Sequence, residues 1–235
     1  MANKTVDIPG IGLVDLYKRR GSRSIRLSFS HDGNLRVTLP FWVPYQAAID
    51  FARSKADWIG RNRPESKAIL KSGDRIGKAH RLLFESRATG RTTATVRNNQ
   101  IRVAYAETAA PGDPAVQKAA IAAAQRALKK EAEALLPQRL NQLARANGFS
   151  FKNVTVKQLK SRWGSCNSRK EITLSYYLMQ LPWQLIDYVL LHELTHTEQL
   201  NHGALFWSRL EEGIPGAKQL RKLLKAYRPV VTPQT

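Results

Sequence analysis

The chain has 235 residues and a formal net charge of +20, with a sequence pI of about 10.5. Its 43% hydrophobic and 24% charged residues, with few glycines and prolines, exclude collagen-like, coiled-coil and disordered classes and allow one large domain or two small ones. A single cysteine cannot form an internal disulfide, and no segment has the pattern of a signal peptide or a membrane-spanning helix, so we expect a soluble cytoplasmic protein.

The basic excess is spread over both halves of the chain and is not concentrated in a tail. A positive surface favours polyanionic partners such as nucleic acids. A soluble protein with a generally high pI accounts for the same charge equally well. The charge alone therefore leaves nucleic-acid contact open.

The first part of the chain has mainly the pattern of strands. The predicted strands cover residues 14–17, 24–30, 35–39, 81–85, 93–97 and 100–105. Alternating apolar and polar side chains support the second and third of these, and the turn signal Asp32-Gly33-Asn34 between them predicts a hairpin. Asn98-Asn99 is a turn dipeptide between the last two strands. One helix is predicted from beyond Pro40 to about Arg61, because its apolar residues recur with helical period.

Residues 109–114, Ala-Ala-Pro-Gly-Asp-Pro, are the best candidate for a domain boundary. They divide the chain into a β-rich region, residues 1–112, and a second region, residues 113–235. The second region is predicted to open with a helix from Ala115 to about Ala146, which Pro137 kinks or divides and which ends at Asn147-Gly148.

The rest of the second region mixes strands and helices. Two strands are predicted at residues 154–159 and 172–176, joined by a polar loop that contains Trp163-Gly-Ser-Cys166. Pro182 then begins a strongly apolar helix, and shorter helices are predicted near residues 205–212 and 218–227. The predicted fold class is therefore α+β.

Three of the five histidines lie in the segment His192-Glu-Leu-Thr-His196-Thr-Glu-Gln-Leu-Asn-His202. Residues four apart share one face of a helix, so His192 and His196 can bind one ion, with Glu193 beside its open position. The preceding residues are apolar almost all round, which predicts a buried helix whose polar side chains need strong partners. A metal ion satisfies them together, and three protein ligands with an open fourth position are typical of catalytic zinc.

His202 is the candidate third ligand, and this role requires the helix to end before it. Six residues advance an α-helix by about 600°, which would leave His202 about 120° away from the face of His196. Asn201 tolerates the left-handed conformation that ends helices, and Gly203 adds local freedom. We therefore expect His202 to approach the ion from a turn.

The remaining candidates have weaker signals. His31 and His80 lie in hairpin and strand context, where a surface or packing role is the simpler interpretation. Glu211 and Glu212 are reserve candidates for the third ligand, although a solvated helix face accounts for them better.

The segment around Cys166 has no clear chemistry of its own. No second cysteine supports a zinc knuckle, and nothing in the sequence indicates a lowered thiol pKa, so we expect a structural loop near the cleft. Arg162 and Lys160 could meet anionic substrate groups, and a solvated loop accounts for them equally well.

Several segments together carry a resemblance to a known family. They are Arg162-Trp-Gly-Ser-Cys166, Ile172-Thr-Leu-Ser175, Leu181-Pro182, Ile186-Asp-Tyr-Val-Leu-Leu-His-Glu-Leu-Thr-His196, Asn201-His202, Phe206-Trp207, and, in the front half, Arg19-Arg20 and Lys55-Ala-Asp-Trp-Ile59. In these segments the chain resembles the YgjP-like metal-dependent hydrolases, a family of zinc metallopeptidases related to the SprT and WLM proteins in the zincin superfamily. It departs from the family pattern at Tyr176-Tyr177, where Asn-Trp is frequent. It also has Gln199 where metzincins with this histidine spacing have glycine.

The resemblance implies zinc as cofactor, with His192, His196 and His202 as ligands and Glu193 as the catalytic general base toward a water activated by the metal. It implies a compact zincin-like domain, in which the H-E-x-x-H helix packs on a small sheet, behind a β-rich amino-terminal part. The function it implies is a zinc-dependent hydrolase of metallopeptidase type acting on a peptide or protein.

Two other functions remain open. One is a nucleoside triphosphate (UTP-type) pyrophosphatase, as described for part of this family; Lys18-Arg19-Arg20 and Arg23–Arg26 suit a triphosphate, but a glycine-rich phosphate loop is missing from the sequence. The other is a nucleic-acid-associated protein, either a binding module with a structural zinc or a protease of DNA-bound proteins. Trp42 and Trp58 could stack on bases there, although their spacing favours packing in a core.

Overall fold

The computed structural model describes residues 3–29, 34–62, 69–159 and 161–231, and the chain forms two compact units, residues 1–68 and 69–235. Each unit has its own hydrophobic core. His31, Lys160 and the turn residues Asp32 and Gly33 lie outside the described residues. Within the described part, no helix is both long enough and apolar enough to cross a membrane.

The first unit is a four-stranded sheet with two short helices. Its elements are β1 (Asn3–Ile8), β2 (Gly12–Arg19), β3 (Arg26–Phe29), β4 (Leu35–Pro40), α1 (Tyr45–Ser54) and α2 (Ala56–Asn62). The strand order is β1-β2-β4-β3, and β3 and β4 form the predicted antiparallel pair. Alternate residues of β2 and β4, among them Leu16 and Val37, share a core with Ala48 and Ala52 of α1. The single helix predicted here is two, because the chain tightens at Lys55, whose N–H bonds to the Ala52 carbonyl.

The second unit contains two sheets and four α-helices in its described part. Its elements are β5 (Arg75–Ile76), β6 (His80–Arg87), β7 (Thr93–Arg97), β8 (Gln100–Ala106), α3 (Pro114–Asn147), β9 (Asn153–Lys157), β10 (Gly164–Cys166), β11 (Glu171–Ser175), the 3-10 helix η1 (Tyr176–Gln180), α4 (Trp183–Thr195), α5 (Ala204–Gly213) and α6 (Ala217–Leu224). The mixture of sheets and helices confirms the predicted α+β class.

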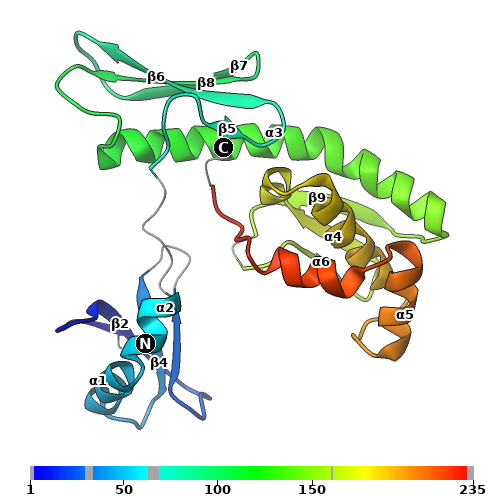
Figure 1. The fold of residues 1–235 in the computed structure, drawn as a ribbon, viewed down its shortest axis with the longest axis horizontal. Coiled ribbons are helices and arrows are strands. Elements are labelled where there is room, and N and C mark those ends of the chain that lie inside the picture. The colour runs from blue at the N-terminus through cyan, green and yellow to red at the C-terminus, as the bar shows by residue number, and fades with distance from the viewer. Residues whose placement is uncertain (1–2, 30–33, 63–68, 160, 232–235) are drawn as a thin grey trace. The chain divides into compact units, whose positions relative to one another are not determined.

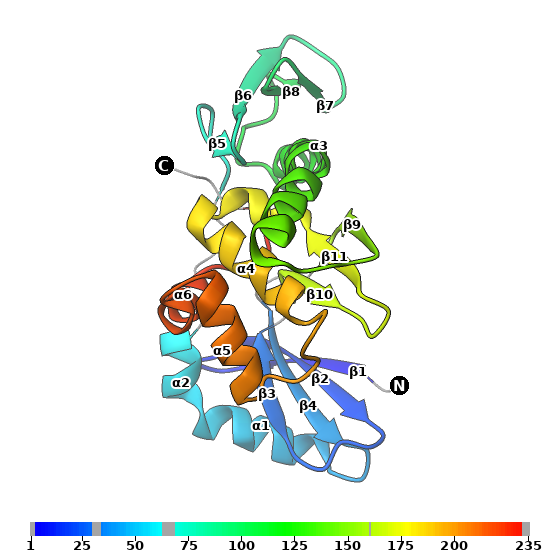
Figure 2. The same cartoon turned by 90° about the vertical axis from the view of Figure 1, so that its right-hand side faces the viewer.

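Helix α3 connects the two sheets of this unit (Figures 1 and 2). The sheet β5-β6-β8-β7 lies on one side of α3, and α4 and β9 lie on the other. The β7–β8 hairpin turns at Asn98-Asn99, both with positive φ, as predicted. Helix α3 ends at Gly148 with φ 71°, also as predicted. Pro137 lies inside the continuous helix α3, so of the two expected effects, a kink or a division, the division is wrong.

The division between the units does not fall at residues 109–114. Leu82 and Ile101 of the sheet β5-β6-β8-β7 share one hydrophobic core with Ala120 and Ala124 of α3. Residues 69–112 therefore belong to the same unit as α3. The Pro/Gly segment is only the turn that leads into α3, with Asp113 as its N-cap. A sheet with one apolar face needs a covering layer, and α3 supplies it.

The small sheet beside α4 has the order β10-β11-β9, in which β9 and β11 are parallel and β10 is antiparallel to β11. The segment predicted as a polar loop therefore contains the edge strand β10. Three residues are too short for an alternation pattern to reveal a strand. The turn that returns the chain into β11 includes Lys170 at φ 59°.

Candidate functional site

Helix α4 places the H-E-x-x-H residues. It begins after Pro182 and is buried on most of its circumference, as its apolar sequence predicts. It ends at Thr195, because the next residues form tighter turns and the Thr197 hydroxyl donates to the Leu194 carbonyl over 2.7 Å. The helix thus ends before Asn201. His202 lies in the segment that precedes α5, and its side chain can approach the histidines of α4 from there.

The structure brings His192, His196 and His202 together. One ring nitrogen of each lies within 4.8 Å of the other two, and the Nε2 atoms of His192 and His202 are 3.1 Å apart. His192 belongs to α4, His196 is the C-cap of this helix, and His202 comes from the segment beyond it, as the sequence predicts. Three convergent imidazole nitrogens are a donor set that suits a divalent transition metal.

Burial favours the neutral forms of His192 and His196. Burial, and to a lesser extent the charges of His196, His202 and Arg221, lowers the pKa of His192 to about 3. Burial also lowers the pKa of His196, whose Nδ1–H donates to the Gln199 carbonyl over 3.0 Å. That bond leaves the lone pair on Nε2, which is the form of imidazole that binds metals.

Glu193 is a buried carboxylate without a partner for one of its oxygens. It is only 5% exposed, and its Oε2 accepts no hydrogen bond from the described residues. Burial raises the pKa of Glu193 to about 8, and the charge of Arg162 acts in the opposite direction. A cation at the neighbouring histidines would favour the ionised carboxylate, as the charge of Arg162 does, so the residues present fit a bound metal ion.

Gly164 of the edge strand β10 makes room for Glu193. A Cβ atom on Gly164 would lie 2.7 Å from both Cγ and Oε1 of Glu193, closer than real Cβ contacts allow. The Trp163-Gly-Ser-Cys166 segment therefore has a geometric role at the site, which its sequence alone did not reveal. Cys166 of the same strand is half-buried, and burial raises the pKa of its thiol to about 11, which keeps it protonated.

Two aromatic residues of α5 support the histidines. Phe206 is fully buried, and its ring centroid lies 4.9, 4.7 and 4.6 Å from those of His192, His196 and His202. Trp207 Nε1 donates to the His202 carbonyl over 3.1 Å, and so holds the turn that carries this ligand candidate. Reasoning from the residues missed both, although Phe206-Trp207 was among the segments of the resemblance.

The other candidates lie outside the cluster. The Glu211 carboxylate accepts from the backbone N–H groups of Gly216 and Ala217 at 2.6 and 3.1 Å, and Glu212 pairs with Arg209. Neither glutamate therefore joins the histidines, which leaves His202 as the third member.

His80 and the two tryptophans are not members of the histidine cluster. His80 is buried with its Nδ1 2.5 Å from Glu131 Oε1, in the packing role expected for it. Trp58 stacks on Phe29 with the ring centroids 6.0 Å apart. Trp42 is 67% exposed, so the core position favoured by its spacing is wrong.

Comparison with known proteins identifies the family. The model of a family described as "YgjP-like, metallopeptidase domain" matches residues 23–227. None of the curated proteins matches the chain. Among solved structures, the chain is similar to the metallopeptidase zymogen abylysin of Pyrococcus abyssi, with 25% identity, a TM-score of 0.36 and coverage of 41% of this chain and 100% of that one. It is also similar to the zymogen jannalysin of Methanocaldococcus jannaschii, with 21% identity, a TM-score of 0.34 and coverage of 38% and 94%.

The family match spans most of the chain and includes the three histidines, Glu193 and strand β10. The segments that carried the resemblance in the sequence lie largely within it. This chain belongs to the YgjP-like metallopeptidase family and is a metal-dependent hydrolase.

Proposed function

We propose that this protein is a zinc-dependent peptidase in which His192, His196 and His202 hold the metal and Glu193 is the general base. The observation that carries the proposal is the convergence of three imidazole nitrogens beside a buried carboxylate with an unpaired oxygen. Zinc bound there would supply a Lewis acid for the scissile carbonyl and lower the pKa of water. Glu193 takes the proton of the attacking water and delivers it to the leaving amine nitrogen.

The outer edge of β10 supports a peptide as substrate, because among the described strands β10 pairs only with β11. Ser175 N–H donates to the Trp163 carbonyl over 2.8 Å, and Asn167 N–H donates to the Glu171 carbonyl over 3.2 Å. Because hydrogen-bonded residues alternate in an antiparallel pair, the backbone groups of Gly164 and Cys166 face away from β11. An extended peptide can pair with such an edge, and its backbone would then lie beside Glu193.

A paired substrate assay tests this function. We expect the zinc-loaded protein to cleave casein or internally quenched peptides, to lose this activity in a chelator and to regain it when zinc is restored. Nucleoside triphosphates, including UTP, are assayed in parallel with phosphate and pyrophosphate as readouts. Release of pyrophosphate without any peptide cleavage would refute the peptidase function and favour the nucleotide alternative.

Replacing Gly164 by alanine should lower turnover and leave metal binding intact. The added methyl group would force Glu193 away from its position, and a displacement of about 1 Å in a catalytic group costs about 100-fold in rate. Gly112→Ala is the matched control, because a Cβ atom there has no neighbour within 4 Å. Peptide cleavage rates and zinc stoichiometry are measured for both. Equal turnover in the two variants would contradict the role given to Gly164.

A further inference from the structure

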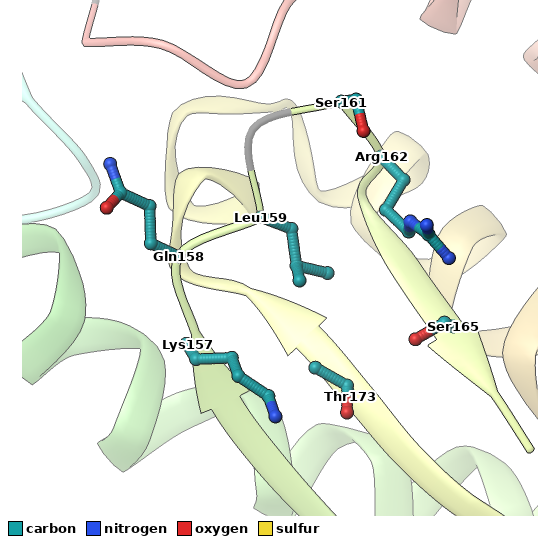
Figure 3. Close-up of a pocket in the computed structure, with 7 residues that line it drawn as sticks. All are labelled: Lys157, Gln158, Leu159, Ser161, Arg162, Ser165 and Thr173. Atoms are coloured by element: carbon teal, nitrogen blue, oxygen red, sulfur yellow. The ribbon is translucent and has the colours of Figure 1, made fainter. Parts of the chain in front are cut away.

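A pocket of about 360 Å³ lies on the small sheet (Figure 3), and the three clustered histidines are not among the described residues that line it. Six polar or charged residues line it: Lys157, Gln158, Ser161, Arg162, Ser165 and Thr173. Ser165 and Thr173 are direct partners across β10 and β11, and Lys157 ends the neighbouring strand β9. The pocket therefore has a floor of regular sheet and one wall formed by the segment that leads into β10.

The lining of this basic pocket suits an anion. Lys157 and Arg162 supply two positive charges, and neither forms an ion pair with an acidic side chain in the described part of the chain. The hydroxyl groups of Ser161, Ser165 and Thr173 add donors around them. No aspartate or glutamate is among the described residues that line the pocket. Cations and hydroxyl donors in one concavity are the groups that bind carboxylates and phosphates in charge-assisted hydrogen bonds.

The position of the basic pocket relates it to substrate binding. Gly164 of β10 lies against Glu193, and the next residue, Ser165, lines the pocket. Successive residues of a strand point to opposite faces of the sheet, so the part of the pocket lined by Ser165 and Thr173 lies on the face of this edge strand opposite to Glu193. Arg162, which also lines the pocket, is near enough for its charge to act on Glu193. A peptide paired with the edge would also direct its side chains alternately to these two faces. One side chain near the scissile bond would thus lie on the face of the pocket.

We propose that the basic pocket binds the side-chain carboxylate of an aspartate or glutamate in the substrate, so that the enzyme prefers acidic peptides. This inference rests on the proposed peptidase function, because it assumes that a peptide pairs with β10. Lys157 is the anchoring residue that can be tested without disturbing Glu193, since Lys157 lies on β9, two strands away from β10.

The test compares C-terminally amidated peptides that differ at one position, with glutamate, glutamine or lysine. Binding is measured by fluorescence anisotropy on the metal-loaded Glu193→Gln variant, which does not depend on turnover, and kcat/KM is measured on the parent protein. We expect the glutamate peptide to bind about tenfold more tightly than the glutamine peptide, and this difference to shrink as salt is added.

Charge reversal in the pocket gives the decisive comparison. Lys157→Glu in the same Glu193→Gln background places a carboxylate beside the remaining charge of Arg162, so it should abolish the preference for the glutamate peptide, and Lys157→Gln should reduce that preference. Lys118→Glu, the same change at an exposed position of α3 outside the pocket, should keep the preference for glutamate. Thermal melting of the variants checks that each one is folded.

Two results would overturn the inference: equal binding of the three peptides, or a preference for the glutamate peptide that persists in Lys157→Glu. These results are distinct from a failure of the proposed function. If the parent protein cleaves no peptide while the glutamate peptide still binds at Lys157, the pocket stands and the peptidase function fails. If the parent protein instead cleaves the three peptides at equal rates, the peptidase function stands and the inference about the pocket fails.

Discussion

Glu193→Gln is expected to bind zinc as the parent protein does and to cleave peptides at least about 100-fold more slowly. The amide has nearly the shape of the carboxylate and preserves the packing against Gly164, but it cannot accept the proton of the attacking water. Zinc content is measured by elemental mass spectrometry, and turnover is measured with the quenched peptides. A variant that cleaves them at the parent rate would show that Glu193 is not the base.

The same variant gives a second readout that needs no metal. In the metal-free protein, burial raises the pKa of Glu193 from 4.5 to about 8. Between these pH values the unfolded chain releases this proton while the folded protein keeps it, so this group lowers the free energy of unfolding as pH rises through the window. Glu193→Gln should lack that decline in denaturant titrations. Identical pH profiles for the two metal-free proteins would mean that the carboxylate is not held in a buried site.

His196→Ala is expected to lose the metal, with zinc affinity lower by at least about 100-fold. Two nitrogen ligands remain, and the loss of a direct ligand exceeds the roughly 10- to 100-fold typical of losing a group that only orients one. Zinc is quantified after dialysis against a weak chelator, and peptide cleavage should fall in parallel. Parent protein that takes up no zinc under these conditions, or a variant that retains it, would refute the assignment of the site.

Glu212→Gln is the control for this experiment. Glu212 is one of the reserve ligand candidates in the sequence, and in the structure it pairs with Arg209 on α5. We expect this variant to keep zinc and turnover. A loss of zinc in Glu212→Gln would mean that the carboxylate joins the histidines when the metal binds.

Much of this protein could be predicted from short segments, because the responsible interactions are local. The four-residue spacing of His192 and His196 places both on one face of a helix wherever that helix lies. The helix ends before His202 because the backbone N–H groups of residues 197–199 donate to the carbonyls of Leu194 and Thr195 and form tight turns. The Asn98-Asn99 hairpin and the end of α3 at Gly148 depend on φ preferences of single residues.

Other features could not be predicted, because they depend on residues that are distant in the chain. β5 has two residues and β10 has three, which is too few for an alternating pattern. These strands can be recognised only from their pairing with neighbouring strands. Residues 69–112 join the second unit because the apolar face of their sheet is covered by α3. A local Pro/Gly signal at residues 109–114 marks a turn but carries no information about which surfaces pack together.

The sequence by itself determined the side chains of the candidate site: His192 and His196 have the spacing of one helix face, Glu193 is adjacent to His192, and His202 follows the end of the helix. Only the tertiary structure decided how this chemistry is supported. Gly164 lies against Glu193, and Phe206 and Trp207 pack behind the histidines, because folding brings β10 and α5 to α4. The basic pocket likewise exists only where three strands and their connecting segment meet. Contacts between different helices and strands determine where these residues lie, so the sequence pattern of a single helix or strand cannot predict them.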